Sequence, residues 1–305
     1  MMKFVSLLLL SAVISVPLSS TAALRVFACE PEWAALVSEL GGEQVKVMVA
    51  TNPKQDPHYV QARPSLISKM RRADLLVCSG AELETGWLPV LLRKGGNRSI
   101  LTGAPGHLMI SDFIQLKEKP LKLDRSEGDI HADGNPHFQT DPRNMLPAAN
   151  AITARMAQLD TDNAAYYQER LADFQRRWQQ ALAGWEQAAL PLRGLPVVVY
   201  HRSWVYLEDW LGLKEVAALE PKPGIPPGSR DLADVLTRTQ GVAGLVIIHS
   251  QYQSSKAIKW LAGNTGAPVV VLPSTVGGTP AAGDLFSWYE DMLQRLLDAR
   301  QEAGQ

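Results

Sequence analysis

The sequence lacks several features that mark common protein classes. It has only two cysteines among 305 residues, which excludes a disulfide-rich scaffold. Acidic and basic residues nearly balance, at 31 and 30, and no block of five or six like charges occurs. This balance argues against nucleic acid or an acidic membrane surface as a partner. Neither a CxxC pair nor an HExxH motif is present, so local spacing alone predicts no metal site.

Long apolar runs are also missing after the N-terminus. The one prominent run, FVSLLLLSAVISV, is shorter than the about 20 residues that a membrane-spanning helix needs. Lys3 precedes it and the small residues of PLSSTAA follow it, which is typical of a secretory signal peptide. We expect cleavage after Ala22 or Ala23, rather than a retained membrane anchor. The mature chain is then expected to be soluble and periplasmic.

Strand and helix patterns alternate along the rest of the chain. Apolar runs rich in β-branched residues predict strands at 25–29, 45–50, 73–80, 195–201, 244–250 and 267–273. Helical spacing predicts helices at 31–42, 63–73, 84–96, 203–213, 232–240, 254–266 and 285–303. This alternation predicts an α/β fold with parallel-type sheets. Cys29 and Cys78 end two of the strands, so they either form one disulfide or remain two buried thiols.

A long helical stretch divides the chain into two halves. Apart from a break at 160–162, apolar residues recur at helical spacing through it, and a helix over 163–188 would be roughly 39 Å long. Such a helix is longer than one small domain needs, so we expect it to brace two α/β lobes. The expected domains are a signal peptide at 1–23, an N-terminal α/β lobe at 24–146, a bracing helix region at 147–192 and a C-terminal α/β lobe at 193–305.

Four of the six histidines lie after predicted strands or in proline-framed loops. His58 follows the strand at 45–50 in the stiff segment NPKQDPHYVQARPS, and His137 lies in GNPHFQTDP. His201 and His249 each end a strand, in VVVYH and VIIH. Because ligands bind beyond the carboxyl ends of parallel strands, two facing lobes would bring these imidazoles into one crevice. Imidazole suits zinc and similar transition metals.

The sequence gives less reason to place the remaining histidines and two aspartates in a metal site. His107 and His131 are interpreted as ordinary polar side chains, although His131, in the polar loop 117–136, could bind metal loosely. Asp56 and Asp141 either orient an imidazole or its loop, or cap turns beside proline.

Several ordered motifs resemble those of a known family. They are QDPHYVQARPSLISKMRRADLLVCSGAELETGW, NPHFQTDPRN, LDTDNAAYYQERLADF, YHRSWVYLEDWLGL and EPKPGIPPGSRDLADVL. Together they resemble the solute-binding proteins of zinc and manganese ABC transporters, the cluster A-I, TroA-like family, over about residues 25–298. The resemblance implies a periplasmic carrier, not an enzyme, that captures a divalent metal between two lobes. It also implies delivery to an ABC permease in the inner membrane, and we expect a monomer.

The resemblance also implies a ligand set. His58, His137 and His201 fall on three metal-ligand positions of the family. At the third position manganese carriers often have glutamate, so His201 favours Zn²⁺ over Mn²⁺ as the cargo.

The family's fourth ligand is a carboxylate just after the last strand, where this chain has Pro273 and Ser274. Water could complete the site, or His249 could serve as a tentative fourth ligand; Glu30 is a weaker candidate. Other interpretations are a carrier of manganese or another divalent metal, a three-histidine zinc hydrolase, and an exported metallochaperone.

Overall fold

The structure, a computed structural model, describes residues 22–120, 128 and 131–304. The predicted signal peptide therefore lies almost wholly outside the described residues. Two four-stranded sheets form the framework, with strand orders β2-β1-β3-β4 and β6-β5-β7-β8, and every pairing within them is parallel. The predicted fold of two parallel α/β lobes is confirmed.

The strands of the first sheet are β1 (Leu24–Ala28), β2 (Val45–Val49), β3 (Leu75–Cys78) and β4 (His107–Met109). Those of the second are β5 (Pro196–Val199), β6 (Lys214–Ala218), β7 (Val246–Ser250) and β8 (Val269–Leu272). The α-helices of the described residues are α1 (Pro31–Gly41), α2 (Pro64–Arg71), α3 (Leu88–Gly95), α4 (Met145–Leu159), α5 (Ala164–Ala188), α6 (Val205–Leu211), α7 (Ser229–Thr239), α8 (Ser255–Thr265) and α9 (Leu285–Ala303). The sequence pattern did not predict β4 and β6, which are sheet edges with few buried residues.

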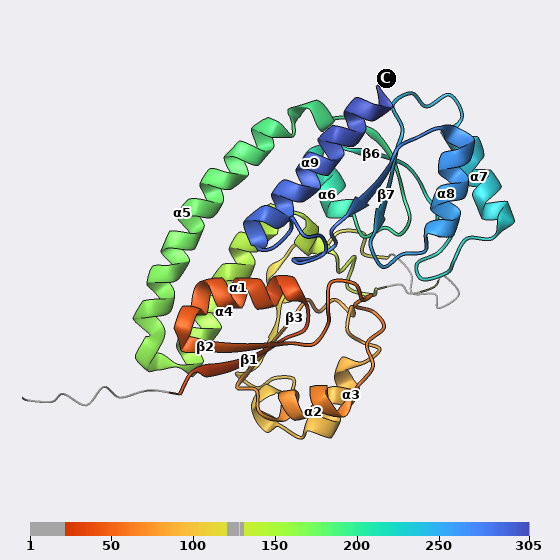
Figure 1. Ribbon diagram of the computed structural model, residues 1–305. Helices are drawn as coiled ribbons and strands as arrows, with labels where there is room; N and C mark the ends of the chain where they lie inside the picture. The colour runs from red at the N-terminus through yellow and green to blue at the C-terminus, as the bar shows by residue number, and fades with distance from the viewer. Residues whose placement is uncertain (1–21, 121–127, 129–130, 305) are drawn as a thin grey trace, which may run out of the picture.

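Helix α5 runs along one side of the molecule from the lower lobe to the upper one, beside α9 (Figure 1). It begins after a break at the predicted place, because α4 ends at Leu159 and a short 3-10 turn occupies Thr161–Asn163. Its buried face contains Phe174 and Trp178, and the Trp178 ring lies 5.5 Å, centroid to centroid, from that of Tyr289 in α9. The helix thus packs with the helix that covers the second sheet.

One apolar core continues through both lobes. It includes Val26 of β1, Trp178 of α5 and Val199 of β5, all of them fully buried. Two smaller cores lie on the outer faces, one where α2 and α3 cover the first sheet and one where α7 and α8 cover the second. The lobes are therefore joined by packed side chains as well as by the chain itself.

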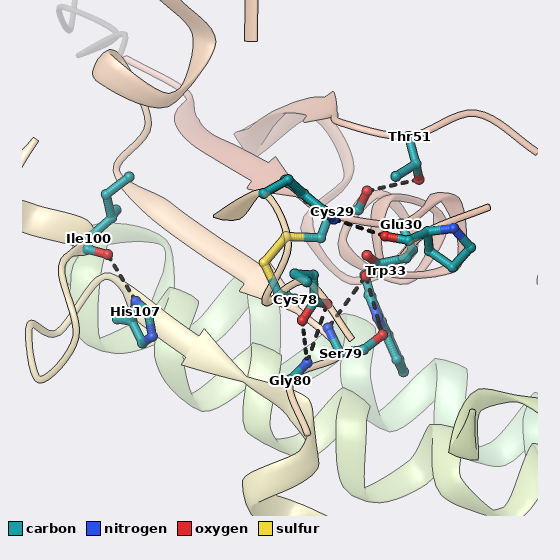
Figure 2. The surroundings of a disulfide bond; sticks show 12 residues. Cys29, Glu30, Trp33, Thr51, Cys78, Ser79, Gly80, Ile100 and His107 are labelled. Atoms are coloured by element: carbon teal, nitrogen blue, oxygen red, sulfur yellow. Dashed lines mark hydrogen bonds between the residues drawn. A yellow bond between two sulfur atoms is a disulfide. The ribbon is translucent and has the colours of Figure 1, made fainter. Parts of the chain in front are cut away.

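Cys29 and Cys78 form a disulfide inside the first lobe (Figure 2). β1 and β3 are adjacent, with Ala28 paired to Val77. Cys29 and Cys78 are the residues that follow this pair, so they lie side by side. The Cα atoms are 4.8 Å apart and both side chains are fully buried. The disulfide alternative is confirmed over the two free thiols. Within the described residues no helix has the length and apolar character that crossing a bilayer requires.

Candidate metal centre

His58 lies in the proline-framed loop between β2 and α2, and its ring is held by Asp56. The Asp56 carboxylate accepts hydrogen bonds from the backbone N–H of His58 at 3.0 Å and, at 2.7 Å, from its ring Nδ1. Trp87 anchors the loop, because its indole N–H donates to the carbonyl of Pro57 at 2.8 Å. Burial alone would raise the pKa of Asp56, but the hydrogen bonds from His58 outweigh it and lower that pKa.

An ionised carboxylate can only accept hydrogen bonds, so Asp56 selects the tautomer of His58 with the proton on Nδ1. The lone pair is then on Nε2, which is buried and has no hydrogen-bond partner. The loop therefore presents Nε2 as the metal-binding atom. The arrangement gives Asp56 the orienting role considered from the sequence.

His137 is the most buried member of the group. Its backbone N–H donates to the side chain of Asn135 at 3.0 Å, and its carbonyl accepts from the hydroxyl of Thr140 at 2.9 Å. Burial lowers the pKa of His137 well below its usual range, and the nearby His58 and His201 lower it further. The imidazole is therefore neutral at physiological pH, and its Nε2 has no hydrogen-bond partner. Neutral imidazole is the form that binds metal ions.

His201 follows β5 in the second lobe, and Glu220 holds its ring. The Glu220 carboxylate lies 2.7 Å from Nδ1 of His201 and also accepts the backbone N–H of Gly224 at 3.0 Å. This repeats the arrangement at His58 and leaves Nε2 of His201 to face the group. Carboxylates placed in this way behind metal-binding imidazoles fix the ring and raise its basicity.

These three histidines converge from both lobes. One ring nitrogen from each of His58, His137 and His201 lies within 4.8 Å of the others. Their ring centroids are 5.3 to 5.8 Å apart. Three imidazoles at this spacing can close around one borderline transition-metal ion, for which zinc–nitrogen distances of about 2.0–2.1 Å are usual.

The structure keeps the other sequence candidates apart from this group. His249 is buried at the end of β7, and its Nδ1 lies 2.9 Å from the carbonyl oxygen of Ser250. The Asp141 carboxylate pairs with Arg143 at 2.7 Å instead of orienting an imidazole. The Ser274 hydroxyl accepts a hydrogen bond from the side-chain amide of Gln251 at 3.2 Å. The carbonyl of Pro273 accepts one from the indole N–H of Trp288 at 2.7 Å.

Glu30 is nearly fully buried beside Ser79, whose backbone N–H and hydroxyl donate to its carboxylate. Burial, and then the nearby Glu84, raise the pKa of Glu30 well above its usual range. Metal binding needs the deprotonated carboxylate, so a raised pKa makes Glu30 a weaker metal ligand. His107 is also accounted for, since its Nδ1 lies 2.9 Å from the carbonyl oxygen of Ile100 (Figure 2).

Sequence reasoning gave little weight to two residues that lie beside the three histidines. The ring of His131, interpreted as an ordinary polar side chain that could bind metal loosely, lies 5.4 Å from that of His58. Its position six residues before His137, in a turn-forming stretch with glycine and proline, was an available signal. Glu220 had been noted only as part of a Glu-Pro segment, and 19 residues separate it from His201.

We expect Glu220→Gln to weaken zinc binding by about tenfold, because losing the carboxylate behind a metal-bound imidazole usually has an effect of this size. The amide no longer bears the charge that holds His201 in its metal-binding tautomer. Competition with a chromogenic chelator would measure the change, with Glu169→Gln on the exposed face of α5 as the control. Equal affinities for Glu220→Gln and the unsubstituted protein would show that Glu220 does not support the site.

Two parallel-sheet lobes with imidazoles gathered where they meet define the class of two-lobed substrate-binding proteins. The chain belongs to the family "ZnuA: Zinc-uptake complex component A periplasmic", whose model matches residues 26–299. This confirms the resemblance found from the sequence. Proteins of this family bind substrates for ABC transporters and are not enzymes, so the hydrolase alternative is set aside.

Individual relatives include carriers of different metals. The chain is 26% identical over 198 residues to the high-affinity zinc uptake system protein ZnuA of Yersinia pestis, covering 60% of this chain and 61% of that protein. It is 27% identical over 177 residues to the manganese ABC transporter substrate-binding lipoprotein ScaA of Streptococcus gordonii, covering 56% and 53%. These alignments thus span only about half to three fifths of the relatives' own lengths. A crystal structure of ZnuA shares the fold, with a TM-score of 0.71, 20% identity, and 93% of this chain and 100% of that one covered.

Proposed function

We propose that this protein is a periplasmic carrier that captures Zn²⁺ between its lobes and delivers it to an ABC-type permease in the inner membrane. The single observation that supports this most directly is the group of three ring nitrogens, from His58, His137 and His201, within 4.8 Å of one another. Both lobes contribute to the group. An ion bound there would be coordinated by residues of both lobes rather than by one surface loop.

Zinc is favoured over manganese by the chemistry of the donors. All three are imidazoles, which suit zinc, whereas manganese prefers carboxylate, carbonyl and water oxygens. The carboxylates nearest the rings, Asp56 and Glu220, are engaged with Nδ1 atoms and serve as supports. The manganese protein among the relatives keeps a manganese carrier as the second candidate.

The remaining parts of the proposal concern the context in which the carrier works. Residues 1–23 act as the export signal, and the lobes at 24–146 and 193–305 work as one monomer across the bracing region 147–192. The family match and the zinc-uptake protein among the relatives support delivery to a permease as the role.

Metal analysis of the purified mature protein tests the proposal. We expect one zinc ion per chain after incubation of metal-free protein with equimolar zinc and manganese, measured by inductively coupled plasma mass spectrometry. His249→Ala should bind the same amount, because its ring is engaged with Ser250. A chain that takes up manganese in preference would support the second candidate, and one that binds neither metal stoichiometrically would overturn both.

A further inference from the structure

A fourth histidine belongs to the same cluster. The ring of His131 lies 5.4 Å from that of His58, which is nearly the 5.3 Å that separates His58 from His137. His131 lines a cavity of about 350 Å³ together with His137 and His201, and a second cavity of about 530 Å³ together with His58. It therefore lies beside the three-histidine group and borders both cavities.

The turn that contains His131 is held by the first lobe. The backbone N–H of Ala132 donates to the Glu82 carboxylate, and the N–H of Gly134 donates to the His131 carbonyl at 3.2 Å. Glu82 and the preceding Ala81 have φ angles of +65° and +49°, which L residues rarely adopt. Such a conformation persists where the surroundings over-determine it, and here it aims Glu82 at the turn.

Gly134 also helps to fix the turn that contains His131. Its φ is +120°, and a Cβ atom there would lie 2.7 Å from the carbonyl oxygen of Lys117, so only glycine fits. The next residue, Asn135, donates from its backbone to that same carbonyl at 2.8 Å and from its side chain to the carbonyl of Arg202 at 2.8 Å. The turn is thus tied to both lobes.

The metal group needs a further donor. Zinc held tightly by proteins is almost always four-coordinate, and in the described part of the chain only His58, His137 and His201 bring ligand atoms within 4.8 Å of one another at this place. Ser274 and Pro273, which follow β8, supply no carboxylate.

We propose that His131 is the fourth ligand and that this chain holds its cargo with four imidazoles. The proposal rests on the proposed function. Tetrahedral zinc places its nitrogen ligands about 3.3 Å apart, so binding draws the His131 ring inward from its place beside His58. A closed set of four protein ligands leaves no open position for water, which suits transport rather than reaction. An all-nitrogen set also discriminates against manganese.

Imidazole NMR on the full mature chain tests the proposal. With ¹⁵N-histidine labelling, the six histidines give six imidazole systems, assigned by single alanine variants. Zinc should shift the ring nitrogens of His58, His131, His137 and His201. The ring-nitrogen resonances of His107 and His249, whose rings contact the carbonyls of Ile100 and Ser250, should not shift.

The matched affinity measurement compares His131→Ala with His107→Ala. We expect His131→Ala to keep one zinc per chain and to bind it at least tenfold more weakly, while His107→Ala binds as the unsubstituted protein does. Three shifted imidazoles and unchanged affinity in His131→Ala would overturn the fourth ligand and leave a three-histidine site intact. Failure of the unsubstituted protein to bind zinc would overturn the proposed function itself, and this inference with it.

Discussion

His58→Ala is expected to weaken zinc binding by about three orders of magnitude. Zinc sites built from protein ligands are stabilised by roughly 10–16 kcal/mol, so one ligand of three or four accounts for about 4 kcal/mol. At 1.4 kcal/mol for each factor of ten, this is about a thousandfold. His58 is the best single test, because its loop lies outside the helices and strands.

Chelator competition gives the affinity, and circular dichroism checks that the variant is folded. His107→Ala is the control, since it removes an imidazole of the same lobe that lies in β4 and is engaged with Ile100. We expect the control to keep full affinity. If His58→Ala and His107→Ala bound zinc equally well, the three-histidine group would not be the metal site.

Replacing both cysteines by alanine is expected to lower the free energy of unfolding by about 4 kcal/mol. The disulfide closes a loop of 49 residues, and the loss of chain entropy in the unfolded state predicts this size. Cys29 and Cys78 are both fully buried, so the variant also loses packing in the core of the first lobe. The metal group lies on other residues, so zinc stoichiometry should stay at one per chain.

Urea denaturation of the metal-free protein measures this effect. The unsubstituted protein unfolded in the presence of a strong reductant provides the matched comparison, and its midpoint should approach that of Cys29→Ala with Cys78→Ala. Coinciding midpoints for the oxidised protein and the double variant would contradict a stabilising role for the disulfide.

The sequence predicted the parts of the fold that depend on periodicity. Strands β1, β3, β5 and β7 are continuous apolar runs because they lie in the middle of their sheets, covered on both faces. The break between α4 and α5 was visible in a run of polar residues. The edge strands β2 and β8 were still predicted, because each is rich in β-branched residues. Strand β4 was missed because it has only three residues, and β6 was missed because its sequence, KEVAA, begins with two charged residues.

Within the candidate site, position along a strand was predictable and side-chain direction was not. His201 and His249 both follow strand patterns, yet His201 faces the group while His249 turns to the carbonyl of Ser250. Glu220 reaches His201 from the loop after β6, and His131 reaches His58 from a polar loop. Contacts of this kind depend on three-dimensional packing, which hydrophobic periodicity does not reveal.

The apolar core that runs through both lobes limits how far the lobes can open. Opening the lobes widely would expose rings such as Trp178 and Tyr289, each at a cost of about 4–6 kcal/mol at 25 cal/mol per Å² for 150–250 Å². Empty and filled chains should then have nearly the same outline. Under the proposed delivery to a permease, a permease that recognised the outline alone would be blocked by empty carriers. Recognition of filled carriers would then depend on the loops that contain the histidines.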